Sequence, residues 1–142
     1  MRDAALRALR GSDLILHAGD VGAPEILEAL KALASVVAVR GNVDSSARGQ
    51  TLPLTEIIEA ESAKIYMLHI LEDLELNPSV AGFQIVICGH SHKPGQYWKA
   101  GVLYVNPGSA GPKRFRLPIT VACLDLGIRP WSAEFIELES ES

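Results

Sequence analysis

The chain has 142 residues, of which 48% are hydrophobic and 21% charged, and a formal net charge of −4. This length and balance are typical of one globular domain, so we expect a single domain over residues 1–142, which would bury about 70% of its unfolded-chain surface. The mild negative charge without a Lys/Arg block gives no indication of a nucleic-acid or anionic-membrane partner. No apolar run reaches the ~18 residues of a membrane span. Cys88 and Cys123 lie far apart in apolar runs, and we expect two buried thiols in a reducing cytoplasm.

The first third of the chain alternates between helix and strand patterns. Ala and Leu at helical spacing predict a helix over residues 2–10, and an apolar run over residues 13–20 then ends in Gly-Asp. Residues 23–34 carry an early proline and one apolar stripe, which indicates a second helix. A β-branched run over residues 35–42 ends in Gly-Asn and predicts a strand, followed by a loop over residues 43–53.

The remainder has mostly strand patterns. We expect strands over residues 54–60, 63–69, 83–90, 101–109, 118–126 and 132–138, a loop with one helical turn over 71–83, and a frayed end over 139–142. Alternating α and β followed by mostly β favours a two-layer β core covered by helices.

Polar side chains close the strands of the predicted sheet. Asp20 and Asn42 end two strands, His69 and His90 end two later ones, and His92 follows two residues on. Ligands of open α/β sheets bind beyond the carboxyl ends of strands. Mixed oxygen and nitrogen donors suit Mn, Fe, Co, Ni or Zn. A glycine precedes Asp20, Asn42 and His90, which allows the sharp turns that would direct these side chains at one ion.

Each of these residues alone has a plainer explanation. Asp or Asn after Gly is typical of a turn, and a histidine at the end of an apolar run is more often structural. We expect His17, which lies inside its strand, to be structural. The combination of all the motifs at strand ends, in this order, is specific.

The order "GD … GN … H … GHxH" resembles that of the calcineurin-like metallophosphoesterase superfamily. The segments "HAGDVG", "VRGNVD", "GHSHKP" and "NPGSAGPKRF" resemble its small single-domain branch of bacterial and archaeal phosphodiesterases, over about residues 2–138. The resemblance implies an α/β (α+β) fold, a four-layer α/β/β/α sandwich of two packed mixed sheets. It also implies a dinuclear metal site at the edge of one sheet.

The resemblance assigns ligands residue by residue. Asp20 would bridge two divalent metals (Mn, Fe, Ni or Zn), Asn42, His69 and His90 would complete the first metal's ligands, and His92 would bind the second. A paired site of this kind activates a shared water, whose hydroxide would attack a small phosphodiester in line.

Four further features bear on the chemistry, and three of them have two interpretations each. Related phosphatases hold a substrate phosphate with an arginine at the position of Arg40, but Arg40 would also suit an exposed strand end. Asp44 would orient a ligand or cap a turn. Val43 stands where some members carry a histidine general acid, so no side-chain general acid is identified. The segment 106–116, with Lys and Arg near its end, would cradle phosphate or simply join two strands.

One family element has no counterpart. The family begins with a strand carrying Asp-x-His, whereas no such pair precedes Asp20, and residues 2–10 match the helix that follows that strand. The second metal would then keep only Asp20 and His92. We therefore expect this chain to bind at most one metal and to have impaired activity. We also expect that the chain is truncated at its N-terminus and that Met1 is not the biological start. The missing strand would expose a sheet edge, through which homo-oligomers could form.

Two function classes remain open at this point. The first is a metal-dependent phosphodiesterase acting on a small phosphodiester. The second is a non-catalytic protein-interaction scaffold, a use shown by the retromer subunit of similar fold. A structural zinc protein is less favoured because the cysteine clusters of such sites are lacking.

Overall fold

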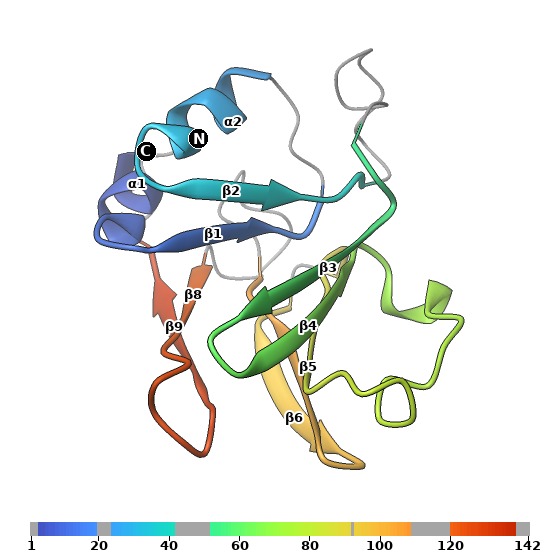
Figure 1. Ribbon diagram of the computed structural model, residues 1–142. Coiled ribbons are helices and arrows are strands. Elements are labelled where there is room, and N and C mark those ends of the chain that lie inside the picture. Colours follow the sequence, from blue (N-terminus) through green and yellow to red (C-terminus); the bar gives the residue numbers. More distant parts are fainter. Residues whose placement is uncertain (1–2, 20–23, 42–51, 92, 109–119, 139–142) are drawn as a thin grey trace.

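The computed structural model describes residues 3–19, 24–41, 52–91, 93–108 and 120–138 (Figure 1). The first part contains α1 (Asp3–Leu9), β1 (Leu14–His17), α2 (Pro24–Lys31) and β2 (Ser35–Ala38). The second part contains β3 (Thr55–Ala60), β4 (Ala63–Leu68), the short 3-10 helix η2 (Leu71–Asp73), β5 (Ile85–Ile87), β6 (Gly95–Lys99), β7 (Val102–Asn106), β8 (Thr120–Leu124) and β9 (Ala133–Glu137). None of the helices in these ranges is long and apolar enough to cross a membrane.

The strands form one large mixed sheet and two strand pairs. The five-stranded sheet has the order β3-β4-β5-β7-β6, in which β4, β5 and β7 run parallel and the two outer strands are antiparallel to their neighbours. β1 and β2 form a parallel pair, and β8 and β9 an antiparallel pair. Because β4, β5 and β7 are parallel, their carboxyl ends meet at one edge of the large sheet.

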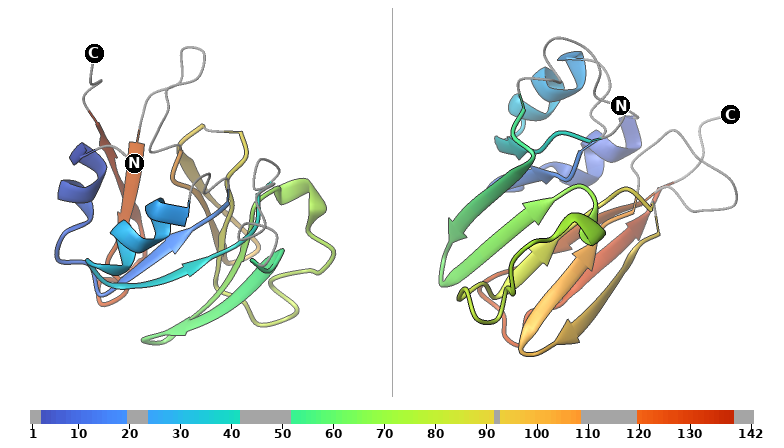
Figure 2. Two further views of the ribbon diagram at one scale, coloured as in Figure 1. Left: turned by 90° about the horizontal axis from the view of Figure 1, so that it is seen from above. Right: turned by 90° about the vertical axis from the view of Figure 1, so that its right-hand side faces the viewer.

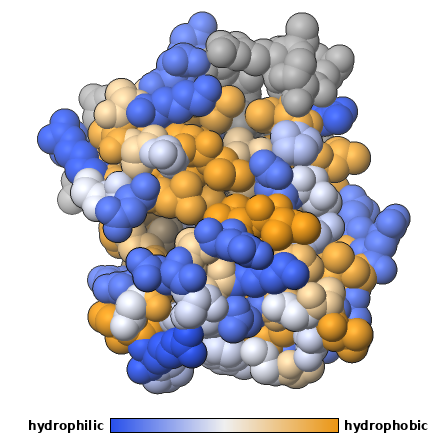
Figure 3. Space-filling model, in the orientation of Figure 1, coloured by the Kyte–Doolittle hydropathy of each residue, from blue (hydrophilic) through white to orange (hydrophobic). Residues whose placement is uncertain are grey.

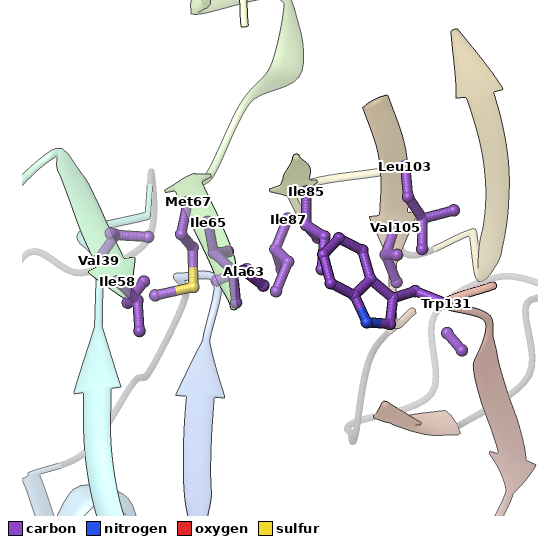
Figure 4. Close-up of a cluster of buried hydrophobic side chains, with 12 residues drawn as sticks. Val39, Ile58, Ala63, Ile65, Met67, Ile85, Ile87, Leu103, Val105 and Trp131 are labelled. Carbon is purple, nitrogen blue, oxygen red and sulfur yellow. The ribbon is translucent and has the colours of Figure 1, made fainter. Parts of the chain in front are cut away.

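The core lies between the large sheet and the two strand pairs (Figure 4). Trp131 packs beside Ile85, Ile87 and Val105 of the large sheet, and its indole nitrogen donates to the carbonyl oxygen of Leu126 at 3.0 Å. A buried tryptophan therefore has a partner for its only polar group. Leucine and valine side chains of β1 and β2 extend the same cluster, so one apolar core joins all three sheets.

Helices cover the outer side of the strand pairs (Figure 2). Leu27 of α2 packs on Ala38 of β2, and Ala5 of α1 packs on Val121 of β8. The far face of the large sheet is covered by the segment around η2, where Leu71 contacts a second buried cluster. The predicted α/β arrangement of packed sheets flanked by helices is confirmed, with a 3-10 turn and loops in place of an α-helix on that far side.

The surface facing the viewer in Figure 1 has an uneven distribution of apolar residues. Figure 3 shows that they gather in its upper half, in the region of β1 and β2, and that hydrophilic residues dominate below. Some apolar side chains of both strands are only partly buried, among them Leu16 and Val37.

The strand β6 was missed by the sequence analysis. All five of its residues are exposed, so the alternation that marks a half-buried strand is absent. Pairing with β7 positions the strand instead, helped by the Tyr97 and Tyr104 rings, which stack with centroids 4.9 Å apart. The predicted loop 43–53 and frayed end 139–142 lie largely or wholly outside the described residues, and the missing first strand stays a prediction.

Candidate metal site

His69 follows β4 directly and is buried, with 5% of its surface exposed. Its Nδ1 atom lies 2.7 Å from the carbonyl oxygen of Ala18, the residue that follows β1. A carbonyl oxygen only accepts hydrogen bonds, so Nδ1 carries a proton, and the tautomer of the neutral ring that this bond favours has its unshared electron pair on Nε2. A backbone carbonyl that fixes one ring nitrogen in this way is the usual support of a metal-binding histidine.

The backbone of Gly19 and of Gly89 lies close to the His69 ring. A Cβ atom at Gly19 would lie 2.5 Å from His69 Nδ1 and 3.0 Å from the Cα of Gly41, and one at Gly89 would lie 3.4 Å from His69 Nδ1. Gly19 also has a φ of +107°, which L side chains rarely adopt. The segments that follow β1 and β5 thus approach one imidazole closely, because neither glycine carries a side chain, and Gly41 after β2 lies beside Gly19.

His90 lies in a tight turn after β5. The amide of Ser91 donates to the carbonyl oxygen of Gly89 at 2.9 Å, and His90 between them has a φ of 69°. This is a γ-turn with a positive central φ, a rare and strained form. The turn sets the exposed His90 ring edge-on to His69, with ring centroids 5.2 Å apart and an interplanar angle of 77°.

The structure brings together two of the five predicted ligands, His69 and His90. Asp20, Asn42 and His92 lie outside the described residues. Within the described ranges no three His, Cys, Asp or Glu side chains form a group able to hold a metal. The complete ligand set therefore stays a prediction.

Among the other predicted positions, Arg40 and His17 lie within the described residues and the rest do not. The backbone amide of Arg40 donates to Pro53 at 2.7 Å and its Nε to Leu52 at 3.3 Å, which ties this half-buried arginine to the chain before β3. His17 Nδ1 accepts a hydrogen bond from the Gly19 amide at 3.2 Å. The described residues leave out Val43, Asp44 and the segment 109–119, which holds Lys113, Arg114 and Arg116.

Cys88 stands directly before this turn and is buried. Burial, with a smaller contribution from the negative charge of Glu72, raises the pKa of the Cys88 thiol to about 11. A neutral thiol is neither a nucleophile nor a metal ligand at neutral pH.

Asn106, the last residue of β7, was not singled out by the sequence analysis. Its Nδ2 donates to the Gly89 carbonyl oxygen at 3.1 Å and to Ser91 Oγ at 3.0 Å, and its Oδ1 accepts from the Gly108 amide at 2.9 Å. An asparagine before Pro-Gly at the end of a strand was the available sequence signal, since Asn side chains bond backbone two residues on.

The sequence of the chain matches known families over most of its length. Residues 1–128 match the model of the calcineurin-like phosphoesterase superfamily domain. The chain is 40% identical over 105 residues to a protein of Methanocaldococcus jannaschii named a probable metallophosphoesterase. That match covers 68% of this chain and 53% of the relative, so the chain spans about half the length of that protein.

Two solved structures share the fold. Vps29 from Entamoeba histolytica in complex with Zn²⁺ has a TM-score of 0.71 at 22% identity, covering 94% of this chain and 86% of Vps29. An archaeal phosphodiesterase has a TM-score of 0.70 at 18% identity, covering 93% of this chain and 89% of the other. At these identities the likeness shows the fold alone, and the family follows from the match over residues 1–128: the chain belongs to the calcineurin-like phosphoesterase superfamily.

Proposed function

We propose that this chain is a divalent-metal-dependent phosphoesterase that hydrolyses small phosphodiesters. The observation that carries the proposal is the pair His69 and His90, held edge-on at the carboxyl ends of two parallel strands. A histidine ring fixed by a backbone carbonyl, beside a second ring in a strained turn, is an arrangement that a structural role does not require.

The chain's residues suit a metal of the Mn, Fe, Ni or Zn type. His69 would bind through Nε2, because its Nδ1 is bonded to Ala18. Asp20 comes one peptide bond after Gly19, whose backbone lies against the His69 ring, and Asn42 comes one peptide bond after Gly41, whose Cα would lie 3.0 Å from a Cβ at Gly19. Imidazole together with carboxylate and amide oxygen is a suitable donor set for these metals. We propose Asp20, Asn42, His69 and His90 as ligands of one ion. His92 would be a ligand of a second ion, for which this chain has too few ligands. An ion bound by the four residues would polarise the phosphoryl oxygens and lower the pKa of water.

The chain's own groups would bind and orient the substrate. Arg40 follows β2 at the same edge, and its Nε bond to Leu52 fixes the direction of the side chain. We propose that its guanidinium forms bidentate hydrogen bonds to two phosphate oxygens, which arginine can do and lysine cannot.

The proposal is tested by metal analysis together with hydrolysis of bis(p-nitrophenyl) phosphate. The chain dialysed against Mn²⁺ or Zn²⁺ should retain about one ion, and hydrolysis should stop with a chelator and resume when metal is restored. His90→Ala should lose both properties, whereas Arg10→Ala, which changes an exposed residue after α1, should keep both. Retention of no metal at micromolar concentration by the folded chain would reject the proposal.

A non-catalytic interaction scaffold is the second candidate. It is supported by the exposed aromatic residues of the outer strand β6, where Tyr97 and Trp98 are 49% and 51% exposed. Aromatic side chains of this kind are enriched at protein interfaces. Metal binding without hydrolysis of any phosphodiester or phosphomonoester tested would favour this candidate.

A further inference from the structure

We propose that Asn106 is a positioning residue, which holds the γ-turn of residues 89–91 in its strained form and so keeps His90 beside His69. The inference rests on the proposed function only for the consequence that metal affinity depends on Asn106. The hydrogen bonds of Asn106 to the γ-turn are present without a metal, so this part of the inference does not depend on the proposed function.

The γ-turn needs an external support. A positive φ at a residue with a Cβ is strained and persists only where surrounding contacts hold it. The hydrogen bond within the turn, from the Ser91 amide to the Gly89 carbonyl oxygen, does not link it to the sheet. The Gly89 amide donates to the His69 carbonyl oxygen at 2.9 Å, but this bond holds only the residue before His90 and leaves Ser91, on the other side, to another support. His90 itself is exposed, so burial does not fix its backbone.

Asn106 supplies that support from the next parallel strand. One amide nitrogen, Nδ2, donates to Gly89 on one side of His90 and to Ser91 on the other. Both ends of the turn are thereby tied to the end of β7. The orientation of the amide is unambiguous, because the Gly108 N–H is a donor and must face the oxygen Oδ1.

The segment that carries Asn106 is itself fixed. Thr120 is buried, and its hydroxyl donates to the Pro107 carbonyl oxygen at 2.7 Å. Gly108 lies so close that a Cβ there would fall 2.0 Å from Thr120 Oγ1 and 3.2 Å from the Cβ of Pro94. Hydrogen bonds and close contacts therefore connect β8 to residues 106–108, and the Asn106 side chain in turn bonds the γ-turn.

The test compares Asn106→Ala with Gln96→Ala. Gln96 also makes three side-chain hydrogen bonds, to Ser132 and to both backbone groups of Ala133, but it joins β6 to β9. In the metal-free chain, Asn106→Ala should speed hydrogen exchange at the Ser91 and Gly108 amides and leave Ala133 unchanged. Gln96→Ala should have the opposite effect. Unchanged exchange at Ser91 in folded Asn106→Ala would overturn the proposal.

The second measurement is the affinity for Zn²⁺ by calorimetry. Asn106→Ala should weaken it by about 10–100-fold, the usual effect of removing a support of metal ligands, and Gln96→Ala should leave it unchanged. Ser91→Ala keeps the bond to Gly89 and should have a smaller effect than Asn106→Ala. Equal affinities of the wild-type and Asn106→Ala chains would also overturn the proposal. If the wild-type chain binds no Zn²⁺, the proposed function fails, while the exchange measurement still decides the role of Asn106.

Discussion

The His69 ring lies against the backbone of Gly19, at a spacing that no side chain at position 19 would permit. The ring nitrogen Nδ1 would be 2.5 Å from a Cβ there, and the same nitrogen donates to Ala18 at 2.7 Å. The bond that orients the imidazole and the absence of a side chain at Gly19 therefore depend on each other. A bulkier residue would push the ring away from the carbonyl that fixes its tautomer.

Gly19→Ala should accordingly abolish metal binding and lower the free energy of unfolding by more than about 2 kcal/mol, through backbone strain together with overlap. Gly82→Ala is the matched control, since Gly82 also has a positive φ, 85°, but a Cβ there would meet nothing within 4 Å. It should lose only about 1–2 kcal/mol and bind metal normally. Chemical denaturation and calorimetric titration with Zn²⁺ measure both effects. Normal metal binding by a folded Gly19→Ala chain would contradict the expectation.

The positive φ of His90 predicts that the residue lowers the stability of the fold, although it is needed for metal binding. Replacement by glycine removes the ring and also relieves the positive φ of 69°, whereas replacement by alanine removes the ring and keeps the strain. We expect His90→Gly to be more stable than His90→Ala by about 1 kcal/mol, and neither to bind metal. Thermal unfolding of the two variants gives the difference. Equal stabilities would show that the turn relaxes once the ring is gone.

The sequence carries much of this fold in local patterns, but not the contacts that organise the site. Most strands could be located from apolar periodicity and from the Gly-Asp, Gly-Asn and Gly-His pairs that follow them. The same patterns placed His69 and His90 at strand ends. The role of Ala18 could not be predicted, because a carbonyl oxygen belongs to every residue and its partner is 51 positions away. Asn106 was missed for a similar reason, since its link to Gly89 depends on β5 and β7 being neighbours.

The burial of Cys88 predicts low thiol reactivity with a defined pH dependence. With a pKa of about 11, only about one thiol in a thousand is ionised at pH 8, and alkylation of Cys88 should quicken about tenfold per pH unit up to that value. Burial also raises the pKa of Cys123, but this side chain is only partly buried and should react first. Timed iodoacetamide labelling with peptide mass spectrometry measures both rates. Faster labelling of Cys88 than of Cys123 in the folded chain would contradict the burial argument.

The same shift has a consequence for stability. The unfolded Cys88 thiol loses its proton near pH 9.0, while the folded one keeps it until about pH 11. Protons are thus bound more tightly in the folded state, and this contribution to stability, present below pH 9, should be lost as the pH rises between these values. Cys88→Ala should flatten that part of the pH profile, and an unchanged slope would assign the loss to other groups.

Substitution of Arg40 can distinguish a structural role of its side chain from a role in binding substrate. Its backbone amide bonds Pro53, and this contact survives any substitution except proline, so Arg40→Ala removes only the guanidinium and its bond to Leu52. If the guanidinium binds phosphate, the substitution should remove about 1.5–3 kcal/mol of charge-assisted hydrogen bonding. The value of kcat/KM for a phosphodiester should then fall by about 10–150-fold. Arg40→Lys keeps the charge but not the planar fork, and should recover only part of the loss. Zn²⁺ affinity should stay unchanged in both variants, because arginine is no metal ligand. Loss of metal affinity together with activity would mean that Arg40 supports the site structurally, and unchanged kinetics would leave it a residue of the strand end.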